Sequence, residues 1–404
     1  SQLPGKTALG HVRYSTTGES RTENLQPLFA NLALGGFACA HNGNLTNTIS
    51  LKKRLVETGS IFQTTSDTEI ILQLVARSKK EKLLDKLVDA LSQIKGAYSL
   101  IILTNKKLIG IKDPYGIRPL VLGKKNGSPV LASETCALDM IGAEYIRDIN
   151  NGEIVVITND GIQSVKPFKK VKERPCIFER IYFASPDSFI NGKTVYTYRK
   201  ALGEQLAIEN NINADVVVPI PDSGVSAAIG FSQKSKIPFE LGIIRSHYVG
   251  RTFIEPTQNI RQFGVKLKHS VNRSCIKNKK VILIDDSIVR GTTANKIVSM
   301  VFEAGAKEVH LGISCPPIKF PDYYGIDTPN YNELIASNND ISSMTKIVGA
   351  TSLFFLSLTG TYKAMGYNDR DQINPQFSDH CFTGDYPIDI KEILKSKHND
   401  DKRK

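Results

Sequence analysis

The chain has 404 residues, of which 41% are hydrophobic and 23% charged, and its formal net charge is +12. This length exceeds what one hydrophobic core usually supports, so we expect two domains, and the composition excludes a disordered or fibrous chain. The sequence contains no apolar run of about twenty residues, no basic nucleic-acid motif and no Cys-x-x-Cys pair, so we expect a cytoplasmic protein with reduced thiols that binds neither membranes nor nucleic acid.

The first part of the chain, to about residue 165, alternates short apolar strands with turns rich in Gly, Asn and Pro. Two helical segments interrupt it, near 46–58 and 67–94, and in the second Ile70, Ile71 and Leu74 begin an apolar stripe at helical spacing. This pattern predicts α/β layers with mostly antiparallel strands.

A basic, proline-containing stretch at 165–175 marks the expected boundary, which predicts domains over 1–168 and 169–390 and a frayed polar tail over 391–404. Beyond the boundary, strand-like runs alternate with helical ones, as in KVILIDDSIVRGTT followed by ANKIVSMVFEAGA. Repeated strand-helix units predict a parallel sheet, whose ligands bind at the carboxyl ends of the strands.

Asp285 and Asp286 end the apolar run VILIDD, and adjacent carboxylates repel each other. In the loop after them Gly291 lets backbone N–H groups converge, and Thr292 and Thr293 can cap the next helix. A helix N-terminus behind such a loop suits a phosphate. Carboxylates beside it suit ribose hydroxyls and a divalent cation, so we expect a sugar phosphate here. The alternative is a solvated Asp-Asp turn.

The stretch VILIDDSIVRGTT resembles the phosphoribosyl diphosphate (PRPP) signature of the type I phosphoribosyltransferases. With seven further motifs in order, nearly the whole chain resembles the glutamine PRPP amidotransferase family: GHVRYSTTG (10–18), AHNGNLTN (40–47), TTSDTEI (64–70), KDPYGIRPL (112–120), VPIPDSG (218–224), YVGRTFIEPTQ (248–258) and YYGIDTP (323–329). The resemblance implies an α/β fold: a partial N-terminal-nucleophile (Ntn) glutaminase αββα sandwich, then a type I phosphoribosyltransferase domain with a central parallel sheet.

The resemblance also implies a glutamine site. Arg13 would clamp the α-carboxylate of glutamine, Asp67 would hold its α-ammonium, and Asn42 and Gly43 would form the oxyanion hole. Taken alone, the Asn-Gly pair would favour a hairpin turn, a frequent use of that dipeptide.

Members of the family begin with a cysteine whose own α-amino group serves as base, so the nucleophile must be the first residue. Here Ser1 stands in that place, just upstream of Arg13. We therefore expect Ser1 to be a truncation edge and the glutaminase half of this chain to be inactive.

On the transferase side, the resemblance implies that PRPP and Mg²⁺ share one site. The expected Mg²⁺ ligands are Ser223, Asp285 and Asp286, and the expected PRPP contacts are Ser223, Gly224, Asp285, Asp286, Ser287, Ile288, Val289, Arg290, Gly291, Thr292 and Thr293. The basic stretch at 245–273 is either a disordered linker or a lid, and the resemblance favours a lid in which Arg251, Lys266 and Lys268 contact pyrophosphate.

Many relatives carry an iron–sulfur cluster held by four cysteines. Cys176 matches one ligand region, but Asp322 stands where clustered members have cysteine, and Cys381 lacks the upstream cysteine pair. We therefore expect no iron–sulfur cluster.

The implied activity belongs to de novo purine biosynthesis. Glutamine, or free ammonia, would supply the nitrogen that displaces pyrophosphate from PRPP to give 5-phosphoribosylamine. Purine nucleotides would be feedback inhibitors and the protein a homo-oligomer. The alternative from another class is a catalytically inactive PRPP or nucleotide sensor, and the retention of a glutamine site and a lid argues against it.

Overall fold

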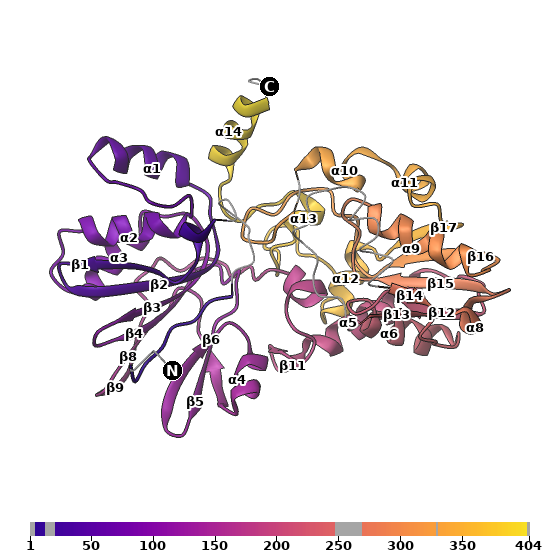
Figure 1. Ribbon diagram of the computed structural model, residues 1–404, viewed down its shortest axis with the longest axis horizontal. Helices are drawn as coiled ribbons and strands as arrows, with labels where there is room; N and C mark the ends of the chain where they lie inside the picture. Colours follow the sequence, from indigo (N-terminus) through magenta and orange to yellow (C-terminus); the bar gives the residue numbers. More distant parts are fainter. Residues whose placement is uncertain (1–4, 13–20, 247–268, 329, 402–404) are drawn as a thin grey trace.

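The computed structural model describes residues 5–12, 21–246, 269–328 and 330–401, with side chains as far as residue 396. It forms two lobes (Figure 1). The first lobe comprises η1 to β9 and the second comprises η2 to α13. None of the described helices is long and apolar enough to cross a bilayer.

Among the described residues, the first lobe contains two antiparallel sheets. The larger has six strands in the order β1 (Leu28–Leu32), β2 (Gly35–Leu45), β3 (Gly96–Thr104), β4 (Leu108–Lys112), β8 (Ile154–Thr158) and β9 (Gly161–Val165). The smaller has three, in the order β6 (Ser128–Ala132), β5 (Val121–Lys125) and β7 (Glu144–Asp148).

Alternation along β3 explains how the layers stack, because successive side chains point to opposite faces. Leu100 and Ile102 pack with the helices, whereas Ile101 packs with the core between the two sheets. The helices on the first face are α1 (Thr48–Glu57), α2 (Thr68–Arg77) and α3 (Leu83–Leu91), and α4 (Thr135–Ile141) packs on the smaller sheet through Leu138. The order helix, sheet, sheet, helix confirms the predicted αββα sandwich.

The single helical segment predicted over 67–94 is wrong, because α2 and α3 are separate helices. Ser78 ends α2 in an extended conformation. Its hydroxyl donates to Asp89 Oδ2 at 2.5 Å, and its carbonyl accepts from the ammonium of Lys86. These contacts fold the polar segment between the helices back onto α3.

The described part of the second lobe contains a four-stranded parallel sheet, which confirms the predicted transferase architecture. Its order is β12 (Val216–Pro219), β15 (Lys280–Asp285), β16 (Glu308–Ile313) and β17 (Ser352–Phe355). Val218, Leu283, Leu311 and Leu353 lie side by side across it, all buried. A strand covered on both faces is uniformly apolar, as these are.

Helices cover both faces of the parallel sheet (Figure 1): α5 (Val195–Glu209) and α6 (Val225–Ser235) lie on one side, α9 (Thr292–Glu303) and α11 (Ile341–Val348) on the other. Ala294, Ile297, Val298 and Val301 are all buried in α9, as their helical spacing predicts. The remaining elements are η1 (Thr22–Asn24), η2 (Glu179–Phe183), β10 (Phe189–Ile190), β11 (Lys193–Thr194), β13 (Ile243–Arg245), β14 (His269–Val271), α8 (Arg273–Ile276), η3 (Tyr331–Glu333), α10 (Ile335–Asn338), α12 (Leu358–Ala364), α13 (His380–Thr383) and α14 (Lys391–Asp401).

The predicted frayed tail over 391–404 is wrong for its described part, because Lys391–Asp401 forms α14. The Glu392 carboxylate accepts from the Ser50 backbone N–H at 2.7 Å and from its hydroxyl at 2.6 Å, in the first turn of α1. A carboxylate is stabilised at a helix N-terminus, so this contact ties the end of the described chain to the first lobe.

Candidate active sites

Two adjacent carboxylates, the half-buried Asp285 and the buried Asp286, lie at the carboxyl end of β15 in the parallel sheet. Asp285 is the last residue of β15, and Asp286 is 4% exposed. Burial raises the pKa of Asp285 well above its usual value, and the adjacent Asp286 carboxylate raises it further. Within the described residues, neither carboxylate forms an ion pair. The two carboxylates can therefore accept hydrogen bonds from hydroxyl groups or bind a cation.

The loop after β12 faces these carboxylates. The Ser223 side chain lowers the pKa of Asp285 and so partly offsets the rise that burial causes. Gly224 packs so closely against the end of β15 that a Cβ there would lie 2.3 Å from the Ile284 carbonyl oxygen. The structure thus brings the Ser223–Gly224 pair close to the two aspartates, although about sixty residues separate the two pairs in the sequence.

The loop from Ser287 to Thr293 joins the aspartates to α9. The Ser287 hydroxyl donates to Asp286 Oδ2 at 2.5 Å, Ile288 is buried, and the Val289 carbonyl accepts from the backbone of α10 at 2.9 Å. Arg290 is exposed and pairs with Glu333 at 3.1 Å.

The predicted capping role of Thr292 and Thr293 is wrong, because α9 begins at Thr292 and the cap position is Gly291. Gly291 has φ +77°, and a Cβ there would lie 2.7 Å from Ile335 Cδ1, so glycine is required. Both threonines are exposed in the first turn, beside backbone N–H groups that have no acceptor within the helix. This geometry suits an anion.

The ends of the predicted lid are described, although Arg251, Lys266 and Lys268 lie outside the described residues. β13 and β14 pair as an antiparallel ribbon in which Arg245 lies opposite His269. The two described ends of the predicted lid are therefore neighbours. Arg245 also pairs with Asp222, next to Ser223. The predicted lid therefore begins beside the Ser223 loop.

Arg199 is a further cation whose environment includes the Asp286 charge, and it was not among the predicted site residues. Arg199 is buried in α5, and its guanidinium donates to the carbonyls of Arg180 at 3.3 Å and Ala184 at 2.6 Å. Burial lowers its pKa, and the Asp286 charge opposes that change, so Arg199 partly compensates the paired carboxylates. No local motif in the helix α5 signals this role.

In the first lobe, Asn42 and Gly43 lie within the eleven-residue strand β2, opposite Ser99 and Tyr98 of β3. This pairing excludes the hairpin-turn alternative. Gly43 has φ +133°, and a Cβ there would lie 2.2 Å from the Ala97 carbonyl oxygen. The Asn42 side chain makes no hydrogen bond within the described residues, so its amide can bind a ligand.

Asp67 lies beside this strand, at the start of α2. Its Oδ2 accepts from the Leu45 N–H at 2.8 Å, and its Oδ1 is 3.7 Å from His41 Nδ1. The other ring nitrogen of His41 lies 3.2 Å from the Ala97 carbonyl oxygen. Asp67 and His41 thus fix the end of β2. Arg13 lies outside the described residues.

The two lobes meet at this strand. A Cβ on Gly325 would lie 2.8 Å from the Gly43 carbonyl carbon, and Asn44 Nδ2 donates to the Tyr323 carbonyl at 3.5 Å. Arg118 is fully buried at the same junction, where it donates to the Tyr324 carbonyl at 3.2 Å and to Glu179 at 2.6 Å.

The cysteines considered for an iron–sulfur cluster are buried beside a polar network. Burial raises the pKa of Cys176 to about 12 and that of Cys381 well above its usual value, so both are neutral thiols. Asp322 Oδ2 lies 2.8 Å from His380 Nε2. No group of three metal-ligating side chains suited to a metal ion occurs in the described part of the chain. The expected absence of a cluster stays a prediction.

Two family models match the chain: a glutamine amidotransferase domain over residues 11–140 and a phosphoribosyl transferase domain over 200–324. An amidophosphoribosyltransferase of Rhizobium etli is 56% identical over 393 residues, covering 96% of this chain and 79% of that protein. The Bacillus subtilis amidophosphoribosyltransferase is 47% identical over 399 residues, covering 98% and 84%. The solved B. subtilis glutamine PRPP amidotransferase, complexed with ADP and GMP, superimposes with a TM-score of 0.87 at 46% identity, covering 94% and 83%. The chain therefore belongs to the amidophosphoribosyltransferase family.

Proposed function

We propose that the chain forms 5-phosphoribosylamine, for purine biosynthesis, by bringing ammonia to PRPP at the carboxyl ends of β12 and β15. Ammonia attacks C1 of the ribose and pyrophosphate leaves. The observation that carries the assignment is the adjacent Asp285–Asp286 pair, which has no ion-pair partner within the described residues and directly precedes the Gly291 loop and α9.

The aspartates are assigned to the ribose. Two adjacent carboxylates provide acceptors for two vicinal hydroxyls, and each such hydrogen bond is strengthened by the charge. The loop from Ser287 to Thr293 and the first turn of α9 are assigned to the 5′-phosphate, because backbone N–H groups at a helix N-terminus favour an anion. Holding both ends of the sugar phosphate orients C1 for attack.

Ser223 and Gly224 are assigned to the pyrophosphate end. Mg²⁺ fits here, because Ser223, Asp285 and Asp286 offer hard oxygen donors and a cation would offset the burial and the repulsion that raise the pKa of Asp285. Two carboxylates with substrate oxygens form a donor set that Mg²⁺ commonly takes. When bound, the metal would stabilise negative charge on the leaving pyrophosphate.

Asn42, Gly43 and Asp67, with Arg13, are assigned to glutamine. The Asn42 amide makes no hydrogen bond with the described residues, which supports a role in stabilising the oxyanion, since such a donor must not be occupied by the protein itself. Asp67 uses Oδ2 for Leu45, which leaves Oδ1 for the ammonium of glutamine.

We also infer that purine nucleotides inhibit this chain. The solved B. subtilis relative is complexed with ADP and GMP, and this likeness supports the inference. A homo-oligomeric assembly and a cytoplasmic location stay predictions.

The test is pyrophosphate release from PRPP with ammonium chloride and Mg²⁺ in place of glutamine, which makes the assay independent of the glutaminase half. We expect ammonia-dependent turnover with formation of phosphoribosylamine. A sensor would bind PRPP without turnover, and that result would replace the proposed activity by the sensor alternative.

A further inference from the structure

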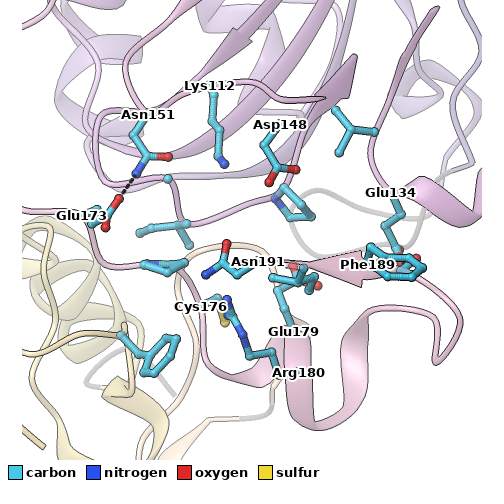
Figure 2. Close-up of a pocket in the computed structure, with 18 of the residues that line it drawn as sticks. Lys112, Glu134, Asp148, Asn151, Glu173, Cys176, Glu179, Arg180, Phe189 and Asn191 are labelled. Carbon is cyan, nitrogen blue, oxygen red and sulfur yellow. Dashed lines mark hydrogen bonds between the residues drawn. The ribbon is translucent and has the colours of Figure 1, made fainter. Parts of the chain in front are cut away.

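A pocket of about 160 Å³ lies between the two lobes, and none of its lining residues belongs to the candidate PRPP or glutamine sites (Figure 2). Lys112 and Asp148 line it from the first lobe, and Arg180, Asn191 and Phe377 line it from the second. A volume of this size exceeds that of a single water and accommodates a small molecule.

Arg180 is the most unusual group in this pocket. It is 2% exposed, and its guanidinium lies between the rings of Tyr198 and Phe377, 5.4 and 4.9 Å from their centroids. Its Nε is buried without a hydrogen-bond partner, and the described residues provide no acceptor for its other guanidinium nitrogens. A buried charged donor normally has a partner, because leaving it unpaired is costly.

Lys112 points into the same pocket from the opposite side (Figure 2). It is the last residue of β4, and no hydrogen bond or ion pair of its ammonium occurs among the described residues. Burial lowers its pKa, and the charge of Asp148 opposes this change. Two cations therefore share one cavity, and the described part of the chain gives neither of them a close acceptor.

The acids around the pocket are, in contrast, largely satisfied by protein donors. Glu134 accepts from the Ser185 N–H at 2.7 Å, and Glu179 is paired with Arg118 at 2.6 Å. A ligand that completes the pocket must therefore supply acceptors rather than donors. Because several carboxylates surround the cavity, a singly charged ligand is repelled less than a doubly charged phosphate.

We propose that this pocket binds the carboxylate of a small, singly charged molecule, held by the guanidinium of Arg180 and the ammonium of Lys112. The rings of Tyr198 and Phe377 hold the guanidinium in place. A planar guanidinium can form two parallel hydrogen bonds with a planar carboxylate. The compact ammonium of a lysine lacks this planar arrangement of donors. The Arg180 carbonyl accepts a hydrogen bond from Arg199, and the charge of Asp286 influences the pKa of Arg199, which burial lowers.

The test uses ¹³C-labelled acetate as the probe and measures its affinity for the chain by NMR titration. Acetate can also reach other cationic groups, so the readout is the difference between the wild-type chain and Arg180→Met. We expect Arg180→Met to weaken acetate binding about tenfold or more and Lys112→Met to weaken it several-fold. Lys124→Met is the matched control, because Lys124 is exposed on β5 outside the pocket, and its affinity should equal that of the wild type.

Equal acetate affinity in Arg180→Met and the wild type would overturn the proposal. A parallel titration with inorganic phosphate tests the ligand class: Arg180→Met should leave phosphate affinity unchanged, and a larger loss for phosphate than for acetate would refute the carboxylate assignment. If Arg180→Met does not fold, Arg180→Lys keeps the charge and should still bind acetate several-fold more weakly, because lysine lacks the planar fork. Unchanged affinity in both Arg180→Lys and Lys112→Met would equally overturn the proposal.

Discussion

Gly325 of the second lobe packs directly against the backbone of Gly43 of the first. A Cβ on Gly325 would lie 2.8 Å from both the Cα and the carbonyl carbon of Gly43, and Gly325 has φ +110°. Real Cβ atoms do not approach backbone this closely, so a side chain here must separate the lobes. The strand that carries the predicted oxyanion-hole residue Asn42 is thus held in place by the transferase lobe.

Gly325→Ala should therefore destabilise the chain for two reasons, the positive φ and the clash. Gly127→Ala isolates the first, because Gly127 has φ +84° and a Cβ there would have no atom of the described residues within 4 Å. Urea unfolding should show a loss of about 1 kcal/mol for Gly127→Ala and about 1–3 kcal/mol more for Gly325→Ala. Equal losses would mean that the lobes move apart at no cost.

Asp322 fixes the turn that presents Gly325. Its Oδ1 accepts from the N–H groups of Tyr324 at 2.7 Å and Ile326 at 2.8 Å, while Oδ2 contacts His380. Asp322→Ala should cost about 3–5 kcal/mol in unfolding free energy, because it leaves these buried groups unpaired. Asp322→Asn should cost clearly less, since the amide oxygen still accepts from both N–H groups. Similar losses for the two variants in urea unfolding would contradict the assigned contacts.

Local patterns predicted those parts of the fold that depend on nearby residues. The buried stripe of α9 follows from the spacing of Ala294, Ile297 and Val298, and β15 follows from a continuous apolar run. The proximity of Ser223 and Asp285 was also predictable. Each lies at the carboxyl end of a strand of the same parallel sheet, and these ends share one edge of the sheet.

The remaining features depend on contacts between distant residues. β17 is a four-residue strand without a flanking motif and is missing from the sequence-based prediction, because only pairing with β16 makes it a strand. The Glu392 carboxylate accepts a hydrogen bond from Ser50, which is 342 residues away in the sequence. Arg199 lies within a helix whose sequence does not reveal that the Asp286 charge influences it. Such contacts leave no periodic trace in the sequence.

Glu153 should make the first lobe sensitive to acid. It is 1% exposed and accepts from Arg147 at 2.7 and 2.9 Å and from the Asn150 N–H at 2.6 Å. Burial alone would raise its pKa, but these donors together outweigh burial and lower it from 4.5 to about 2. Its stabilising effect is therefore fully present above pH 4.5 and is lost as the pH falls toward 2.

Glu153→Gln should consequently lose roughly 1.5–3 kcal/mol of unfolding free energy at pH 7 and a smaller amount at acidic pH. Glu144→Gln is the matched control, because Glu144 is an exposed residue of the neighbouring strand β7. Urea unfolding between pH 7 and pH 3 measures the difference. A loss for Glu153→Gln that does not change with pH would show that the carboxylate charge is not what stabilises this turn.

Asp285 and Asp286 should limit stability while they support turnover. Because burial and then Asp286 raise the pKa of Asp285, the folded chain binds more protons than the unfolded chain above the ordinary value of 3.8. Stability therefore falls as the pH rises from that value through the raised folded pKa. Asp285→Asn removes this dependence, so its unfolding free energy at pH 8 should equal or exceed that of the wild type.

Turnover should change in the opposite direction. A hydrogen bond to a charged group contributes about 1.5–3 kcal/mol, so either Asp285→Asn or Asp286→Asn should lower ammonia-dependent PRPP turnover roughly ten- to hundredfold. Asp215→Ala is the control at the other end of the sheet, where Asp215 Oδ2 accepts from the Lys280 N–H at 2.8 Å. It should lose about 0.5–1.5 kcal/mol of stability with normal turnover. If Asp285→Asn instead behaves like Asp215→Ala, the paired aspartates are structural and the ribose site lies elsewhere.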